Sequence, residues 1–248
     1  MNKTADTIDW SDPTLQTRST ATARQARLAG VGYLLVIAGG LFAEVAARGS
    51  LIVPGDAAAT ARAITDHETL WRWGLAVHLV YLIPAVVVNV LVSGLFRMVA
   101  PALARSALVF GVTAVTVEAV SLLHLFLPLA LIEETGAVAA LSDGQQQALV
   151  YLATRLFATG FAFSLVFFAG FCVLVGWLIL RSRLVPRVFG VMMIVAGGCY
   201  VVNTLALILS PALADRIAPA ILLPILVAEL SLALRLAVRG AGQETVGR

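Results

Sequence analysis

The stretch VTAVTVEAVSLLHLFLPLAL, residues 112 to 131, decides the fold class of this chain. A run of about 18 or more mainly apolar residues predicts a membrane-spanning helix, because a helix satisfies its own backbone groups where lipid offers no partner. The same stretch carries Glu118 and His124. An ionisable side chain near the bilayer centre costs at least about 2.5 kcal/mol, so we expect both side chains to face the interior of a helix bundle.

The rest of the chain has the same apolar character. Of its 248 residues, 60% are hydrophobic and 12% are charged, whereas a soluble domain is about 25% charged. The lipid bilayer is therefore the expected partner. The formal net charge is +3. The chain lacks the basic stripe with interleaved aromatic residues that would indicate a nucleic-acid partner. Cys172 and Cys199 lie in apolar runs without a nearby histidine, so they form no metal motif.

Six segments are long and apolar enough to cross a bilayer. They cover residues 28–47, 73–96, 106–132, 148–180, 188–209 and 219–238. No segment alternates apolar and polar residues with a period of two, which argues against spanning strands. The sequence therefore predicts an all-α, polytopic transmembrane bundle of six helices over residues 25–239. Residues 1–24 and 240–248 are expected to be cytosolic tails, and the first is polar and without periodicity, as in disordered segments.

The basic residues predict the orientation of this bundle. Lys and Arg gather on the cytosolic side of membrane proteins, and the chain distributes its 17 Lys and Arg residues unequally between the two sides. Five lie on one side, namely Arg48, Arg62, Arg72, Arg155 and Arg216. The other twelve place both termini in the cytosol.

The connections on the opposite side carry helix-start signals. In PGDAAATARAI, residues 54–64, Asp56 has the position to cap a short alanine-rich helix, so we expect a small extracytoplasmic helix between the first two spans. Thr65 with Glu68, and Ser142 with Gln145, have the spacing of capping boxes. These pairs predict where the second and fourth spanning helices begin.

Polar residues within the spans are the candidates for a binding site. Counted from the nearest cytosolic arginine at about 1.5 Å per residue, they lie at depths of about 15 to 29 Å in a hydrocarbon core about 30 Å thick. The outer group is Glu44, His78, His124 and Asn203, and the deeper pair is Glu118 and Glu229. We predict that they share one polar pocket that opens outward. Arg155 is a possible counter-ion near the outer interface, for Glu44, Glu133 or Glu134.

Two stretches resemble a known family. RLAGVGYLLVIAGGLFAEVAARGSLIVPGDAAATARAI, residues 27–64, and LVFFAGFCVLVGWLILRSRLVPRVFGVMMIVAGGCYVVNT, residues 165–204, are similar to the bacterial membrane-protein family catalogued as domain of unknown function 4386. The likeness extends from Arg27 to Arg239. It implies a multi-helix protein of the bacterial cytoplasmic (inner) membrane. It brings no assigned activity, cofactor or catalytic residue, so no site residue is carried over.

The favoured function is non-enzymatic transport or sensing of a small polar solute through the predicted pocket. No catalytic residue, metal or cofactor is assigned. One alternative is a structural or assembly subunit, in which the embedded polar residues only form interhelical hydrogen bonds. A second is an intramembrane metal-dependent hydrolase with zinc bound by His78, His124 and Glu44 or Glu118, although the histidine spacing matches no metal motif. A third is haem b held axially by the two histidines.

Overall fold

The computed structural model describes residues 13–133, 140–182 and 184–242. They form helices joined by short connections, and no strand occurs among these residues, which confirms the predicted all-α class. The first span consists of α1 (Pro13–Leu41), a π-helix η1 (Phe42–Arg48) and α2 (Gly49–Leu51). The remaining elements are α3 (Ala57–Asp66), α4 (Glu68–Leu95), α5 (Pro101–Leu122), a 3-10 helix η2 (Leu123–Phe126), α6 (Leu127–Ile132), α7 (Asp143–Arg181), α8 (Arg187–Leu209) and α9 (Pro211–Arg239).

Among the residues that the structure describes, six helical segments are long and apolar enough to span a membrane, as predicted. They are Thr22–Leu51, Glu68–Leu95, Pro101–Ile132, Asp143–Arg181, Arg187–Leu209 and Ala220–Arg239. The chain is therefore a multi-pass membrane protein. Because helical hydrogen bonding continues past the apolar runs, most helices are longer than predicted. In particular, α1 begins at Pro13, so residues 13–24, expected to be disordered, belong to the first helix.

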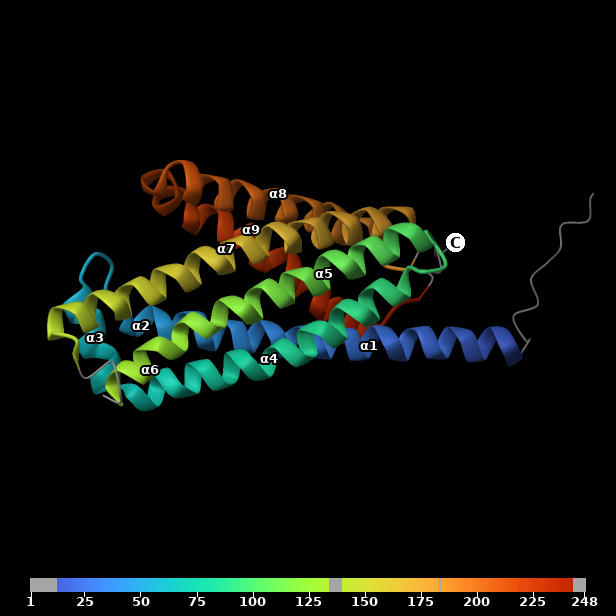
Figure 1. Cartoon of the computed structure of the whole chain (residues 1–248). Helices are drawn as coiled ribbons and strands as arrows, with labels where there is room; N and C mark the ends of the chain where they lie inside the picture. The colour runs from blue at the N-terminus through green and yellow to red at the C-terminus, as the bar shows by residue number, and fades with distance from the viewer. Residues whose placement is uncertain (1–12, 134–139, 183, 243–248) are drawn as a thin grey trace, which may run out of the picture.

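The six spans form a closed ring. α1 packs against α4, α4 against α5, α5 against α7, α7 against α8 and α8 against α9, and α9 returns to α1. Figure 1 shows the long helices running side by side, with α3 and α6 at one end and the start of α1 and the finish of α9 at the other. We call these the α3 end and the terminal end.

Small residues allow the closest helix approaches in the ring. A Cβ atom on Gly176 would lie 2.6 Å from the carbonyl oxygen of Gly190, and one on Gly190 would lie 2.7 Å from that of Gly176. Between α1 and α9, a Cβ on Gly30 would lie 2.2 Å from the backbone nitrogen of Ala237. Small residues at such crossings let the backbones of membrane helices approach closely, which increases their van der Waals contact.

The short helix α3 begins as predicted but ends later. The Asp56 carboxylate accepts a hydrogen bond from the amide of Ala59 at 2.8 Å, which confirms the N-cap. Thr65 does not cap α4: it lies inside α3, where its hydroxyl donates to the carbonyl of Ala61 at 3.0 Å. The chain reverses only at His67, immediately before α4, so no room remains for a cap at Thr65.

At the start of α7 the predicted capping box is present. The amide of Ser142 donates to the side chain of Gln145 at 2.9 Å. This contact fixes the first turn of the longest helix of the bundle.

The third span is interrupted by proline. Pro128 has no N–H group for the carbonyl of His124, and the amide of Leu127 bonds that carbonyl instead, in 3-10 geometry. The indole N–H of Trp71 on α4 donates to the nearby carbonyl of Leu125 at 3.2 Å. The break therefore supplies a carbonyl that ties α4 to the third span.

Candidate functional site

A π-helix at the α3 end positions two charged residues. In η1 the amide of Gly49 bonds the carbonyl of Glu44, five residues earlier, and Glu44 and Arg48 both lie in this turn. Short π-helical turns are rare and are found frequently at functional sites. Arg48 is only 4% exposed, although it follows the last residue of the first predicted span.

The Arg48 guanidinium is held by three groups. Its Nε donates to Glu44 Oε2 at 3.3 Å, and its Nη2 forms an ion pair with Glu44 Oε1. Its Nη1 lies 3.1 Å from His78 Nδ1 on α4. Its carbon Cζ lies 4.5 Å from the centre of the Phe157 ring on α7, a cation–π distance. The guanidinium is thus fixed from three elements.

The contact with Arg48 determines the form of His78. A guanidinium has only donors, so His78 Nδ1 must accept and cannot carry a proton. Neutral histidine then has its proton on Nε2, which lies 3.0 Å from Glu118 Oε1 on α5. His78 is therefore assigned as the neutral Nε2–H form, donating to Glu118. Its side chain is 0% exposed.

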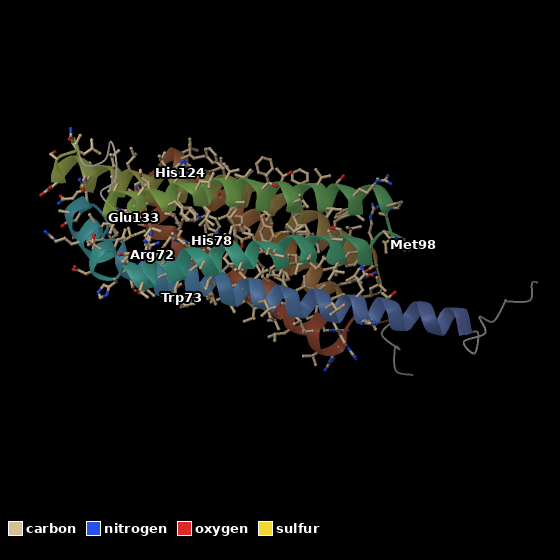
Figure 2. The ribbon with its side chains drawn as sticks, turned by 60° about the horizontal axis from the view of Figure 1, so that its bottom comes forward. Arg72, Trp73, His78, Met98, His124 and Glu133 are labelled. Atoms are coloured by element: carbon tan, nitrogen blue, oxygen red, sulfur yellow. The ribbon has the colours of Figure 1, made fainter. Side chains whose placement is uncertain are left out.

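Tyr81 completes the arrangement one turn after His78. Its hydroxyl donates to Glu118 Oε1 at 2.5 Å and lies 2.8 Å from His78 Nε2. The two rings are stacked with their centroids 4.6 Å apart. We call Glu44, Arg48, His78, Tyr81 and Glu118 the polar network. Figure 2 shows His78 between the helices, near the α3 end of the bundle.

The two carboxylates are the most exposed members of the network. The side chains of Glu44 and Glu118 are 38% and 14% exposed. Trp71, Leu75 and Leu125 close around Arg48 and leave no space for a water molecule. The guanidinium is therefore enclosed, whereas both carboxylates keep a partly exposed edge.

Two hollows at the α3 end lie outside the network. One of about 450 Å³ is lined by residues 65–70 and Trp73, at the turn between α3 and α4. One of about 370 Å³ lies between α3, α6 and α7, and its lining includes Arg62, Asp66 and Asp143. Neither hollow is lined by a network residue.

Glu229 belongs to a second cluster. Its Oε1 accepts a hydrogen bond from the Tyr200 hydroxyl at 2.6 Å. The buried Tyr33 hydroxyl faces the same carboxyl without a hydrogen bond of standard geometry. The structure separates Glu229 from Glu118, in contrast to the predicted common pocket, because α9 and α5 are not neighbours in the ring.

The remaining predicted site residues lie outside the network. His124 Nδ1 contacts the carbonyl of Ser121 at 3.0 Å, and Figure 2 shows His124 apart from His78. Asn203 is half-buried on α8, where the neighbouring Thr204 hydroxyl donates to the carbonyl of Ala162 on α7. Neither His124 nor Asn203 contacts the five network residues through a hydrogen bond among the described residues.

Arg155 does not act as the counter-ion of Glu44 in this structure. It is exposed on α7, whereas Glu44 pairs with Arg48 and Glu133 pairs with Arg72. The remaining proposed partner, Glu134, lies outside the described residues. Arg48 was not predicted as a site residue, because the apolar run stops at Ala47, although the helix continues to Leu51. The available signal was the four-residue spacing of Glu44 and Arg48, which places them on one helix face.

The geometry adds no support to a zinc or haem site. Both ring nitrogens of His78 are engaged within the network. Over the part of the chain that the structure describes, no three His, Cys, Asp or Glu side chains come together as metal ligands would.

Comparison with known proteins gives a family. A sequence model described as Domain of unknown function (DUF4386) matches residues 28–240. Searches of curated proteins and of solved structures found no match.

Proposed function

The chain belongs to the family described as Domain of unknown function (DUF4386), and we propose that this multi-pass membrane protein recognises a small polar solute, for transport or sensing, without catalysing a reaction. The polar network is the proposed site. The proposed location is the bacterial cytoplasmic membrane, with both termini in the cytosol. The α3 end then faces outward, so the solute is met from the extracytoplasmic side.

The unequal distribution of arginine supports this orientation. Of the 17 Lys and Arg residues, the sequence assigns twelve to the terminal side, among them Arg97, Arg105, Arg181 and Arg187 in short loops, and five to the α3 side. Basic residues in short loops are retained in the cytosol when a membrane protein inserts.

The single observation that carries the functional proposal is the polar network itself. Ionisable residues within a membrane bundle are costly, and by default they mark a site for a solute, an ion or a proton. Five such side chains from three elements converge here, and the two carboxylates keep partly exposed edges. Pure packing would not require a buried arginine, because well-packed apolar residues of similar volume are often at least as stable as a buried ion pair.

A solute panel tests the proposal. Purified protein in lipid nanodiscs is heated with millimolar amino acids, amines, sugars, carboxylates and simple salts at constant ionic strength. A solute that binds the native state raises the unfolding temperature. We expect at least one solute to do so in the native protein and to lose that effect in Glu118→Gln. Glu133→Gln is the matched control, because Glu133 is exposed and pairs with Arg72, outside the network.

Two results would reject the proposal. In one, no solute raises the unfolding temperature and Glu118→Gln only lowers it, as a structural or assembly subunit would behave. In the other, a solute acts equally on the native protein and on Glu118→Gln, which would place its site elsewhere.

A further inference from the structure

The formal charges of the polar network do not balance. Arg48 contributes one positive charge, and Glu44 and Glu118 contribute one negative charge each when both are ionised. His78 adds none, because the Arg48 Nη1 donor 3.1 Å from Nδ1 requires the neutral ring. The remaining member, Tyr81, is a neutral donor to Glu118. The network is therefore one positive charge short.

Glu118 is the carboxylate of the network that lacks a positive partner. Both oxygens of Glu44 face Arg48, so this carboxylate is already paired. Glu118 receives two hydrogen bonds, from His78 and Tyr81, but both reach Oε1. Among the hydrogen bonds of the described residues, none reaches Glu118 Oε2. The Glu118 side chain is 14% exposed, so this carboxylate is not fully enclosed by protein.

We infer that Glu118 binds one small monovalent cation in exchange for a proton. This inference rests on the proposed function and names the solute class of the same site. In the empty site, the carboxyl group of Glu118 carries the proton, and the network is neutral. When a cation binds at Glu118, the proton leaves to the solvent and the cation takes its place, so the net charge stays the same. An alkali metal ion or an ammonium-type ion fits this role.

The neighbouring groups favour this exchange. His78 and Tyr81 of α4 contact Glu118 directly, and Arg48 and Glu44 of η1 lie on the other side of His78. From α7 the apolar Phe157 packs against His78 and Arg48. Uncompensated charge in a membrane interior is costly, so loss of the proton without a cation is disfavoured. The coupling is reciprocal: a bound cation expels the proton, and low pH expels the cation.

Calorimetric titration tests the inference directly. Ammonium, methylammonium, sodium and potassium chlorides are titrated into the protein in nanodiscs, in two buffers with different ionisation enthalpies. We expect release of about one proton per bound cation, and binding about tenfold weaker for each unit of pH decrease while the empty site is protonated. Glu118→Gln is expected to abolish proton release and pH dependence, and Glu133→Gln is expected to keep both. If Glu118→Gln does not fold, Tyr81→Phe replaces it, and weaker binding with proton release retained is expected.

The outcomes separate this inference from the proposed function. Cation binding without proton release, or with release unchanged in Glu118→Gln, overturns the exchange. A neutral or anionic solute that binds only when Glu118 is intact overturns the cation inference and leaves the proposed function in place. If no solute of any charge binds, both fail.

Discussion

Replacing Arg48 by methionine is expected to destabilise the protein strongly. Methionine retains much of the apolar stem, but it removes the guanidinium that pairs with Glu44, donates to His78 and covers the ring of Phe157. Removing one partner of a buried ion pair costs about 3–5 kcal/mol, because the other charge remains without compensation. The Glu44 side chain is 38% exposed and regains some hydration. We therefore expect a loss near the lower limit, about 3 kcal/mol.

The chain contains a matched control for this substitution. Glu68 and Arg72 have the same four-residue spacing in the same order, but their side chains are 36% and 47% exposed. Exposed ion pairs contribute little, because water replaces the lost contact. Arg72→Met is therefore expected to change the free energy of unfolding only slightly.

Denaturant titration in detergent micelles, followed by circular dichroism, measures both variants. A double-mutant cycle with Glu44→Gln adds a second check: removing both charges is expected to cost less than the sum of the single changes, because no lone charge remains. Equal losses for Arg48→Met and Arg72→Met would refute the assignment of Arg48 as the buried centre of the network.

Five further substitutions test the packing and the hydrogen bonds. Gly176→Ala is expected to cost about 1–3 kcal/mol by overpacking the α7–α8 crossing, whereas Gly198→Ala, with no atom within 4 Å of the new Cβ, is expected to be neutral or stabilising in the same titration. Tyr200→Phe is expected to lower the free energy of unfolding by about 1–3 kcal/mol, because it removes a donor to the buried carboxyl group of Glu229. Tyr33→Phe removes a hydroxyl without a hydrogen bond, so thermal unfolding is expected to show a smaller loss. Trp71→Phe removes the N–H donor to the buried carbonyl of Leu125 and is expected to lower the free energy of unfolding by about 1–3 kcal/mol. An unfolding midpoint equal to that of the native protein would contradict this.

Much of the fold follows from composition and local pattern. Apolar runs of spanning length locate all six transmembrane helices, because lipid admits few other backbone arrangements. The N-cap at Asp56 and the capping box at Ser142 follow from short-range hydrogen bonding, which adjacent residues determine. The cap predicted at Thr65 is wrong for a related reason: local spacing does not show that α3 continues to Asp66.

The residues of the candidate site could be predicted only in part from the sequence pattern. Glu44, His78 and Glu118 were identified from their residue types and depth, because any ionisable residue in a span must be compensated. Arg48, the partner of Glu44 and His78, was not, since the apolar run gives no sign that the helix continues as a π-turn into the bundle. The neutral form of His78 is likewise visible only from the position of Arg48 Nη1.

Composition and local pattern are sufficient to show that lipid surrounds this protein, how many spans it has and roughly where they lie, and which side chains cannot remain in lipid unpaired. These properties depend on transfer free energies and on contacts within a few residues. The pairings depend on the tertiary packing: His78 bridges Glu118 and Arg48, and Glu229 lies with Tyr200 in a separate cluster. Helices that are far apart in sequence meet through the close packing of small residues, and the ring order that results selects which charges face each other.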